Sequence, residues 1–140
     1  MGILPKLYDI IEKTSIEALN DLENELYKLH ENIKSEIIAI IGTQDEFKGE
    51  VLISSIDDKN LLKIVSTRIR EKLPELEDPL REKFYNQLIV NFQDLLLFFR
   101  PVLRNVGVLA IVHQKEDIKP IKTWLKEKAN ILVILFKNKL

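Results

Sequence analysis

The stretch LIVNFQDLLLFFRPVLRNVGVLAIV at residues 88–112 holds most of the apolar density of the sequence, so its fold constrains every other assignment. A membrane span needs about 20 consecutive apolar residues with few or no charges. Asp94, Arg100 and Arg104 interrupt the stretch, and each would cost about 2.5 kcal/mol or more inside a bilayer. The sequence therefore predicts that this stretch does not span a membrane.

A single buried helix is equally unfavourable for this stretch. Pro101 would remove a backbone donor and clash with the preceding turn, at a cost of about 3 kcal/mol. Val106-Gly107-Val108 would place a poor helix former between two β-branched residues. Polar breaks at Gln93-Asp94 and Arg104-Asn105 instead separate short β-rich runs. We predict three consecutive antiparallel strands near 87–93, 95–103 and 107–114.

The N-terminal part of the chain has a helical pattern. Apolar residues at spacings of three and four predict an amphipathic helix over 15–33. Thr14 stands where its side chain can close a capping box, which favours a break near Thr14-Ser15 and a separate short helix that starts with Pro5. One continuous helix from 5 to 33 is the alternative.

The middle of the chain indicates a hairpin followed by a second helix. The expected strands are EIIAIIG at 36–42 and GEVLISSI at 49–56, joined by the polar loop 43–48. Asp57 or Asp58 then caps a helix over 58–73, which is expected to stop at Pro74 because a helix interior tolerates proline poorly.

The end of the chain supplies one more helix. Residues 74–87 hold two prolines and many charges, so we expect an irregular connection between the second helix and the first of the three strands. A last helix is predicted over 118–136, after the three strands, with Asp117 as its cap.

Composition excludes several functional classes. The chain has 140 residues, room for one core, and its 46% apolar and 31% charged residues are typical of a folded soluble domain. A net charge of −1 gives no electrostatic case for nucleic acid or an anionic membrane. The sequence has no cysteine, which excludes disulfides and thiolate zinc sites. The segment MGILPKLYDIIEK lacks a secretory pattern, so the cytoplasm is the expected compartment.

Few residues suggest chemistry. His30 is expected at a solvated or rim position, and His113 ends a strand far along the sequence without a cluster of metal-ligand spacing. Ser54 and Ser55 lack the Gly-x-Ser-x-Gly context of a nucleophile, and no phosphate-binding loop can be written through the glycines. We therefore expect no catalytic residues, no metal, no cofactor and no enzymatic activity.

The order helix, two strands, helix, three strands, helix predicts an α+β fold with a central five-stranded antiparallel sheet and helices on both faces, a three-layer sandwich. This order resembles the roadblock (dynein light chain) family. GEVLISSI is similar to that family's second strand, with Gly49, Ser54 and Ser55 at the matching points, and LLLFFRPVLRNVGVLAIVHQ is similar to its fourth and fifth strands. The resemblance implies a roadblock-like domain over 15–140, after an N-terminal helical extension at 1–14.

The resemblance also implies an arrangement of layers and a class of function. The helices at 15–33 and 118–136 are expected on one face of the sheet, and the helix at 58–73 on the other. Roadblock proteins form dimers whose sheets join edge to edge, and they bind or regulate small Ras-like GTPases or act as scaffolds. The expectation is a non-catalytic homodimer or paralogue heterodimer with a small Ras-like GTPase as partner.

The sequence also indicates where such a dimer would form. A short apolar edge strand at LIVNF would pair without control if it were left bare. We therefore expect a two-fold interface between the helix at 58–73 and the strand at 87–93, formed by Val65, Ile69, Leu88, Ile89, Val90 and Phe92. The alternatives are a small-molecule-binding or enzymatic α+β domain, and a longin-type trafficking adaptor.

Overall fold

The computed structural model describes residues 2–33, 35–43, 47–76, 87–92, 94–103 and 105–137. Within its helices and strands, the side chains of residues 59, 69, 70, 72–76, 88, 90 and 92 lie outside this description. Among the described helices, none is both long enough and apolar enough to cross a bilayer.

The centre of the fold is a five-stranded sheet in the order β2-β1-β5-β4-β3, with every neighbouring pair antiparallel. The strands are β1 (Ser35–Gly42), β2 (Val51–Ser54), β3 (Leu88–Phe92), β4 (Leu95–Leu103) and β5 (Val106–Val112). The apolar stretch forms β3, β4 and β5, which confirms the prediction of three strands. Pro101 is tolerated inside β4 because the register shifts between Pro101 and Leu103, and proline within a sheet is found at such irregular positions.

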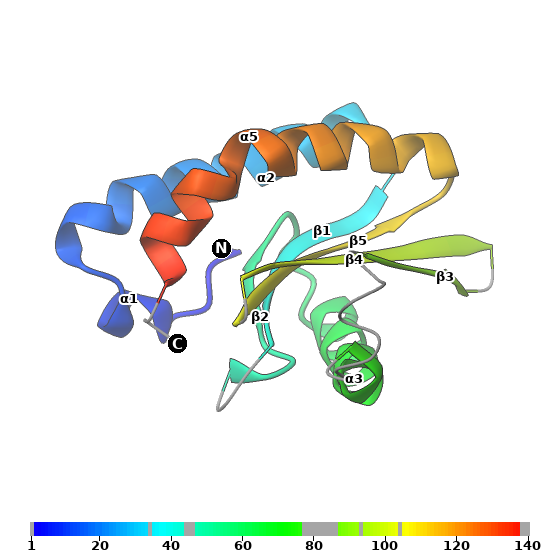
Figure 1. Cartoon of the computed structure of the whole chain (residues 1–140), viewed down its shortest axis with the longest axis horizontal. Helices are drawn as coiled ribbons and strands as arrows, with labels where there is room; N and C mark the ends of the chain where they lie inside the picture. The colour runs from blue at the N-terminus through cyan, green and yellow to red at the C-terminus, as the bar shows by residue number, and fades with distance from the viewer. Residues whose placement is uncertain are drawn as a thin grey trace.

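Helices cover both faces of this sheet (Figure 1), so the predicted α+β class is confirmed. The helices are α1 (Leu7–Ile10), α2 (Ile16–Asn32), α3 (Lys59–Leu76) and α5 (Ile118–Phe136), with short 3-10 turns at Lys13–Ser15 and Lys115–Asp117. In Figure 1, α2 and α5 lie together over one face and α3 lies against the other. The expected distribution of helices between the two faces is confirmed.

Two apolar cores lie on opposite sides of the sheet because successive strand residues point to opposite faces. The larger core joins α2 and α5 to residues such as Ile38, Ile40 and Val108. The smaller core joins α3, through Val65, to residues such as Ile37 and Leu109. Burial on both faces explains why β1 and β5 are nearly continuous apolar runs.

The expected break before α2 is confirmed, but its predicted cause is wrong. A 3-10 turn at Lys13–Ser15 precedes α2, and Ser15, the N-cap residue, forms no side-chain capping bond. The turn is closed by the backbone instead, with the Ser15 N–H donating to the Glu12 carbonyl at 2.8 Å. Pro5 lies in the turn before α1, not at the first position of the helix, because α1 begins at Leu7.

The ends of α3 give one confirmed prediction and one correction. The Asp58 Oδ1 atom accepts hydrogen bonds from the Asn60 and Leu61 N–H groups at 3.0 and 3.1 Å, so Asp58 is the N-cap. The helix runs to Leu76 instead of stopping at Pro74. Proline removes one backbone donor there, which leaves a single carbonyl four residues earlier without its helical partner, and this loss does not end the helix. Most of the predicted connection at 74–87 lies outside the described residues.

The helix α5 has the predicted bounds, but the predicted role of Asp117 is wrong. Asp117 occupies the N-cap position without a side-chain capping bond. Its Oδ2 atom is buried and has no hydrogen-bond partner. The 3-10 turn at Lys115–Asp117 leads directly into α5, so backbone geometry starts this helix where the sequence indicated a side-chain cap.

Candidate interface at the sheet edge

The strand order leaves two edges, β2 and β3, and the chain itself covers the β2 edge. Residues 2–4, which we call the N-terminal strap, run along β2. The Ser54 N–H donates to the Gly2 carbonyl at 2.6 Å, and the Leu4 N–H donates to the Leu52 carbonyl at 2.8 Å. Ile3 forms an antiparallel bridge with Ile53. The strap therefore satisfies the backbone groups that an edge strand would otherwise offer to another chain.

Close packing holds the strap and the segment that follows it. Ile3, Leu7 and Ile11 are buried in the larger core. Gly2 approaches β2 so closely that a Cβ atom at this position would collide with the Ser54 carbonyl oxygen. Only glycine fits there without moving the strap.

Tyr27 on α2 lies where the strap meets the rest of the molecule. Burial raises the pKa of the Tyr27 hydroxyl above its ordinary value of 10.0, and the nearby carboxylates of Asp57 and Glu23 raise it further. A hydrogen bond from the Gly2 backbone acts in the opposite direction and lowers this pKa. Tyr27 thus links the strap, α2 and the segment before α3.

The other edge, β3, has a different environment. β3 pairs with β4 along one side, from Leu88 opposite Phe99 to Phe92 opposite Leu95. Within the described residues, no segment pairs with its other side. Unpaired N–H and C=O groups on a short apolar strand form a template for another chain. The structure thus has one covered edge and one edge that its described part leaves open.

The residues proposed for the interface differ in what they can contribute. Ile89 is 39% exposed on β3, whereas Val65 is only 2% exposed and packs in the smaller core. Val65 therefore holds α3 against the sheet and offers little surface of its own. The side chains of Ile69, Leu88, Val90 and Phe92 lie outside the described part of the structure.

Ile64 was missed by sequence reasoning. It lies next to Val65 on α3 and is 53% exposed, more than any other large apolar side chain described on that helix. The sequence does hold a sign of this exposure. Ile64 falls outside the apolar stripe of Leu61, Leu62 and Val65, which packs α3 against the sheet. An apolar residue off such a stripe is turned away from the core that holds its helix.

The structure also brings together polar residues that are far apart in the sequence. The His30 Nδ1 atom lies 2.8 Å from the Ser35 Oγ atom and 3.3 Å from the Ser55 Oγ atom. The Ser55 hydroxyl accepts the Ile38 N–H at 3.0 Å. Sequence spacing gave no sign of this serine–histidine cluster, whereas the rim position expected for His30 agrees with its half-buried side chain. The contacts join the end of α2 to β1 and to the end of β2, so the cluster fixes these elements to one another.

The second histidine lies at the surface. The His113 Nε2 atom is 2.8 Å from the Glu36 Oε1 atom, and both side chains are 44% exposed. Among the described residues, no group of three or more His, Cys, Asp or Glu side chains could hold a metal ion.

Comparison with known proteins identifies the fold. No protein-family model matches the sequence, and no curated protein matches it. A roadblock/LC7 domain from Streptomyces avermitilis aligns with a TM-score of 0.53 and 12% identity, covering 78% of this chain and 95% of that one. MglB from Myxococcus xanthus aligns with a TM-score of 0.59 and 9% identity, covering 80% and 91%.

A third structure, MglB with a tetrameric arrangement, aligns with a TM-score of 0.59 and 13% identity, covering 79% of this chain and 88% of that one. All three alignments span most of both chains at low identity, so they establish the fold alone. The chain has the roadblock fold, and the resemblance noted in the sequence is confirmed at this level.

Proposed function

We propose that this chain, which has the roadblock fold, is a non-catalytic interaction module that pairs with a second copy through the open β3 edge. The pair presents a two-fold platform that binds or regulates a small Ras-like GTPase or scaffolds a larger complex. One observation carries the proposal. The chain covers the β2 edge with its own strap, whereas within the described residues β3 pairs on one side only.

Pairing of two β3 strands has a physical motive. An antiparallel β3–β3 contact would satisfy the open backbone groups of both copies and join two sheets into one. A two-fold axis places the same patch on both sides of the interface, so one surface is sufficient. MglB, which has the same fold, has been solved in a tetrameric arrangement, and this precedent supports self-association. A paralogue with the same edge could replace the second copy.

The helix α3 would extend the interface beyond the strand. Its exposed Ile64 adds apolar surface on the α3 face of the sheet, whereas Ile89, which pairs with Phe98, faces the α2 and α5 side. The full proposed set is Ile64, Ile69, Leu88, Ile89, Val90 and Phe92, with Val65 supporting α3 from beneath. A stable dimer of this kind is expected to bury at least the standard area of about 1,600 Å².

The first prediction tests the pairing directly. Replacing Ile89 and Val90 by lysine places positive charges next to one another across the two-fold axis and should convert the dimer to monomer in sedimentation. Lysine is one of the residues with which natural edge strands avoid pairing. Ile134→Lys is the matched control, because Ile134 is 71% exposed on α5 and lies on another element. The pairing proposal is lost if the wild-type protein is already monomeric at micromolar concentration.

The GTPase partner has a separate test. Small Ras-like GTPases from the same genome, loaded with GDP or a GTP analogue, are titrated against the wild-type protein and the lysine variant. A preference for one nucleotide state supports regulation, and equal binding supports scaffolding. Binding by the dimer and not by the monomeric variant would show that the platform is the functional form. Failure of every GTPase to bind a proven dimer would contradict the choice of partner while leaving the pairing intact.

A further inference from the structure

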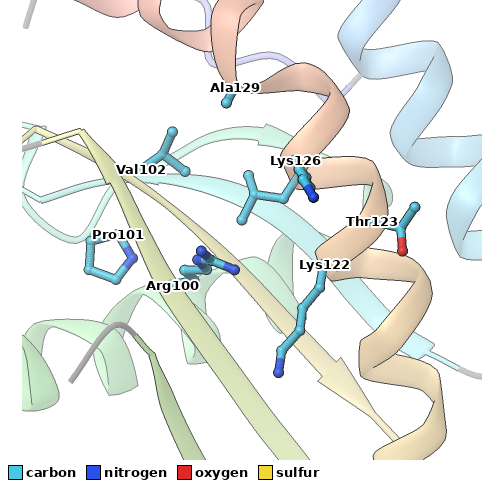
Figure 2. Close-up of a pocket in the computed structure, with 8 residues that line it drawn as sticks. Arg100, Pro101, Val102, Lys122, Thr123, Lys126 and Ala129 are labelled. Atoms are coloured by element: carbon cyan, nitrogen blue, oxygen red, sulfur yellow. The ribbon is translucent and has the colours of Figure 1, made fainter.

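A pocket of about 580 Å³ lies between β4 and α5, on the face of the sheet opposite α3. Arg100 and Val102 line it from β4, and Lys122, Leu125 and Lys126 line it from α5. Figure 2 shows Arg100 directed from β4 toward the helix and Lys122 reaching from α5 back toward the sheet. The volume falls in the range of small-molecule sites, which is roughly 300–1,000 Å³.

The three cations of this pocket have no anionic partner among the described residues. None of Arg100, Lys122 and Lys126 forms an ion pair there, and no carboxylate of the described part of the chain lines the pocket. Another lysine of α5 shows the contrast, since the Lys128 Nζ atom lies 2.6 Å from the Glu25 Oε1 atom of α2. On the α2 side of α5, the positive charge of Lys128 is therefore balanced by Glu25. On the β4 side, the positive charges of the pocket have no such partner among the described residues.

This grouping of like charges is mildly unfavourable, and a bound anion would relieve it. Lys122 and Lys126 are four residues apart on one helix, a spacing at which like charges repel. Arg100 adds a third positive charge from the facing strand. The Lys122 Nζ atom also lies 6.0 Å from the centroid of the Phe98 ring, a cation–π contact that holds this lysine at the pocket.

The remaining lining of the pocket is apolar in part. Leu125 is buried and Val102 and Ala129 are half-buried, so apolar surface lies beside the cations. Small-molecule sites typically combine apolar walls with a few convergent polar groups that fix the ligand's orientation. A guanidinium suits phosphate and carboxylate groups because its donors can bind two oxygens together.

We propose that this pocket binds a small organic anion, with its phosphate or carboxylate held by Arg100, Lys122 and Lys126 and its apolar part resting on Val102 and Leu125. The site is distinct from the proposed dimer interface and does not depend on it. A soluble ligand and a lipid headgroup share this chemistry, so the experiment includes both sources.

The test uses the isotope-labelled chain of 140 residues. Three probes are titrated into it, and their binding is followed by changes in the NMR shifts of the backbone amides. Phenyl phosphate carries both the anion and an apolar body, inorganic phosphate carries the anion alone, and phenol carries the ring alone. Phenyl phosphate should shift amides around Arg100 and in the first half of α5, and it should bind more tightly than either fragment. Vesicles of phosphatidylcholine with and without phosphatidic acid test the lipid source by co-sedimentation.

The variants separate the site from general electrostatic attraction. Arg100→Gln should weaken phenyl phosphate binding about tenfold, the loss expected for one charge-assisted contact. The double variant Lys122→Ala, Lys126→Ala should weaken it at least as much. Alanine is the best helix former, so α5 is retained in this variant even if Arg100→Gln disturbs β4. Lys13→Ala, an exposed lysine in the N-terminal 3-10 turn, is the matched control and should bind like wild type.

Each outcome decides the proposal. Displacement of phenyl phosphate by vesicles that contain phosphatidic acid identifies a headgroup as the source, and binding of phenyl phosphate without vesicle binding identifies a soluble anion. Equal affinity for phenyl phosphate and inorganic phosphate would remove the apolar part of the proposal. Absence of shifts at the pocket, or equal binding by the double variant and Lys13→Ala, would overturn it.

Discussion

At the scale of single residues, Tyr27 makes the stability of the folded protein sensitive to alkaline pH. Burial, together with the carboxylates of Asp57 and Glu23, raises the pKa of the Tyr27 hydroxyl above 10.0 in the folded protein. The folded state therefore retains this proton at a pH where the unfolded chain loses it. The stability that the neutral hydroxyl contributes is present below about pH 10 and is lost as the pH rises through the raised pKa.

Replacing Tyr27 by phenylalanine should remove this alkaline loss. In urea unfolding, the midpoint of the wild-type protein should fall between about pH 9 and about pH 11, where tyrosines ionise, and the midpoint of the Tyr27→Phe variant should fall less steeply. Tyr8→Phe, on the exposed surface of α1, is the control and should follow the wild type. Identical slopes for all three proteins would show that Tyr27 does not govern the alkaline limit.

At the scale of elements, two aspartates at helix starts offer a matched comparison. Asp58 accepts two N–H groups at the start of α3, whereas Asp117 makes no capping bond at the start of α5. Asp58→Ala should lower the free energy of unfolding by about 1 kcal/mol. Asp117→Ala should cost less than that, because it removes a buried carboxylate oxygen that lacks a partner. Denaturant unfolding of both variants measures the difference, and equal losses would contradict it.

The same comparison shows what the sequence can and cannot predict. Element types followed from periodicity and breakers, because Pro101 and Gly107 exclude a long helix wherever the chain lies in space. Helix ends were less predictable, since a cap depends on local backbone geometry that a favourable residue type does not guarantee. Thr14 and Asp117 have suitable side chains, yet 3-10 turns start the helices at those points.

The candidate sites were predicted less completely than the fold. The contacts of His30 with Ser35 and Ser55 join residues 5 and 25 positions apart, and no periodic pattern encodes such a meeting. The strap along β2 and the cations between β4 and α5 likewise depend on tertiary packing. The edge position of β3 was predicted from the short apolar run LIVNF, and the strand order confirms it.

At the scale of the whole molecule, the strap should determine how many copies assemble. Deleting residues 1–4 removes the hydrogen bonds to Leu52 and Ser54 and uncovers the β2 edge. The shortened protein should form species larger than the dimer in sedimentation, and their size should grow with concentration. Circular dichroism would verify that the truncated chain remains folded. A folded, truncated protein that stays dimeric at every concentration would contradict this role of the strap.

A sheet with one sealed edge is a monovalent unit with respect to strand addition. When two such units pair, each uses its single open edge. Strand pairing therefore stops at the dimer, and no longer ribbon can form. The number of copies in the assembly is then fixed by the single open edge of each sheet and not by the concentration of the protein. A partner that recognises a surface shared between both copies would meet the same stoichiometry at any expression level above the dissociation constant of the pair.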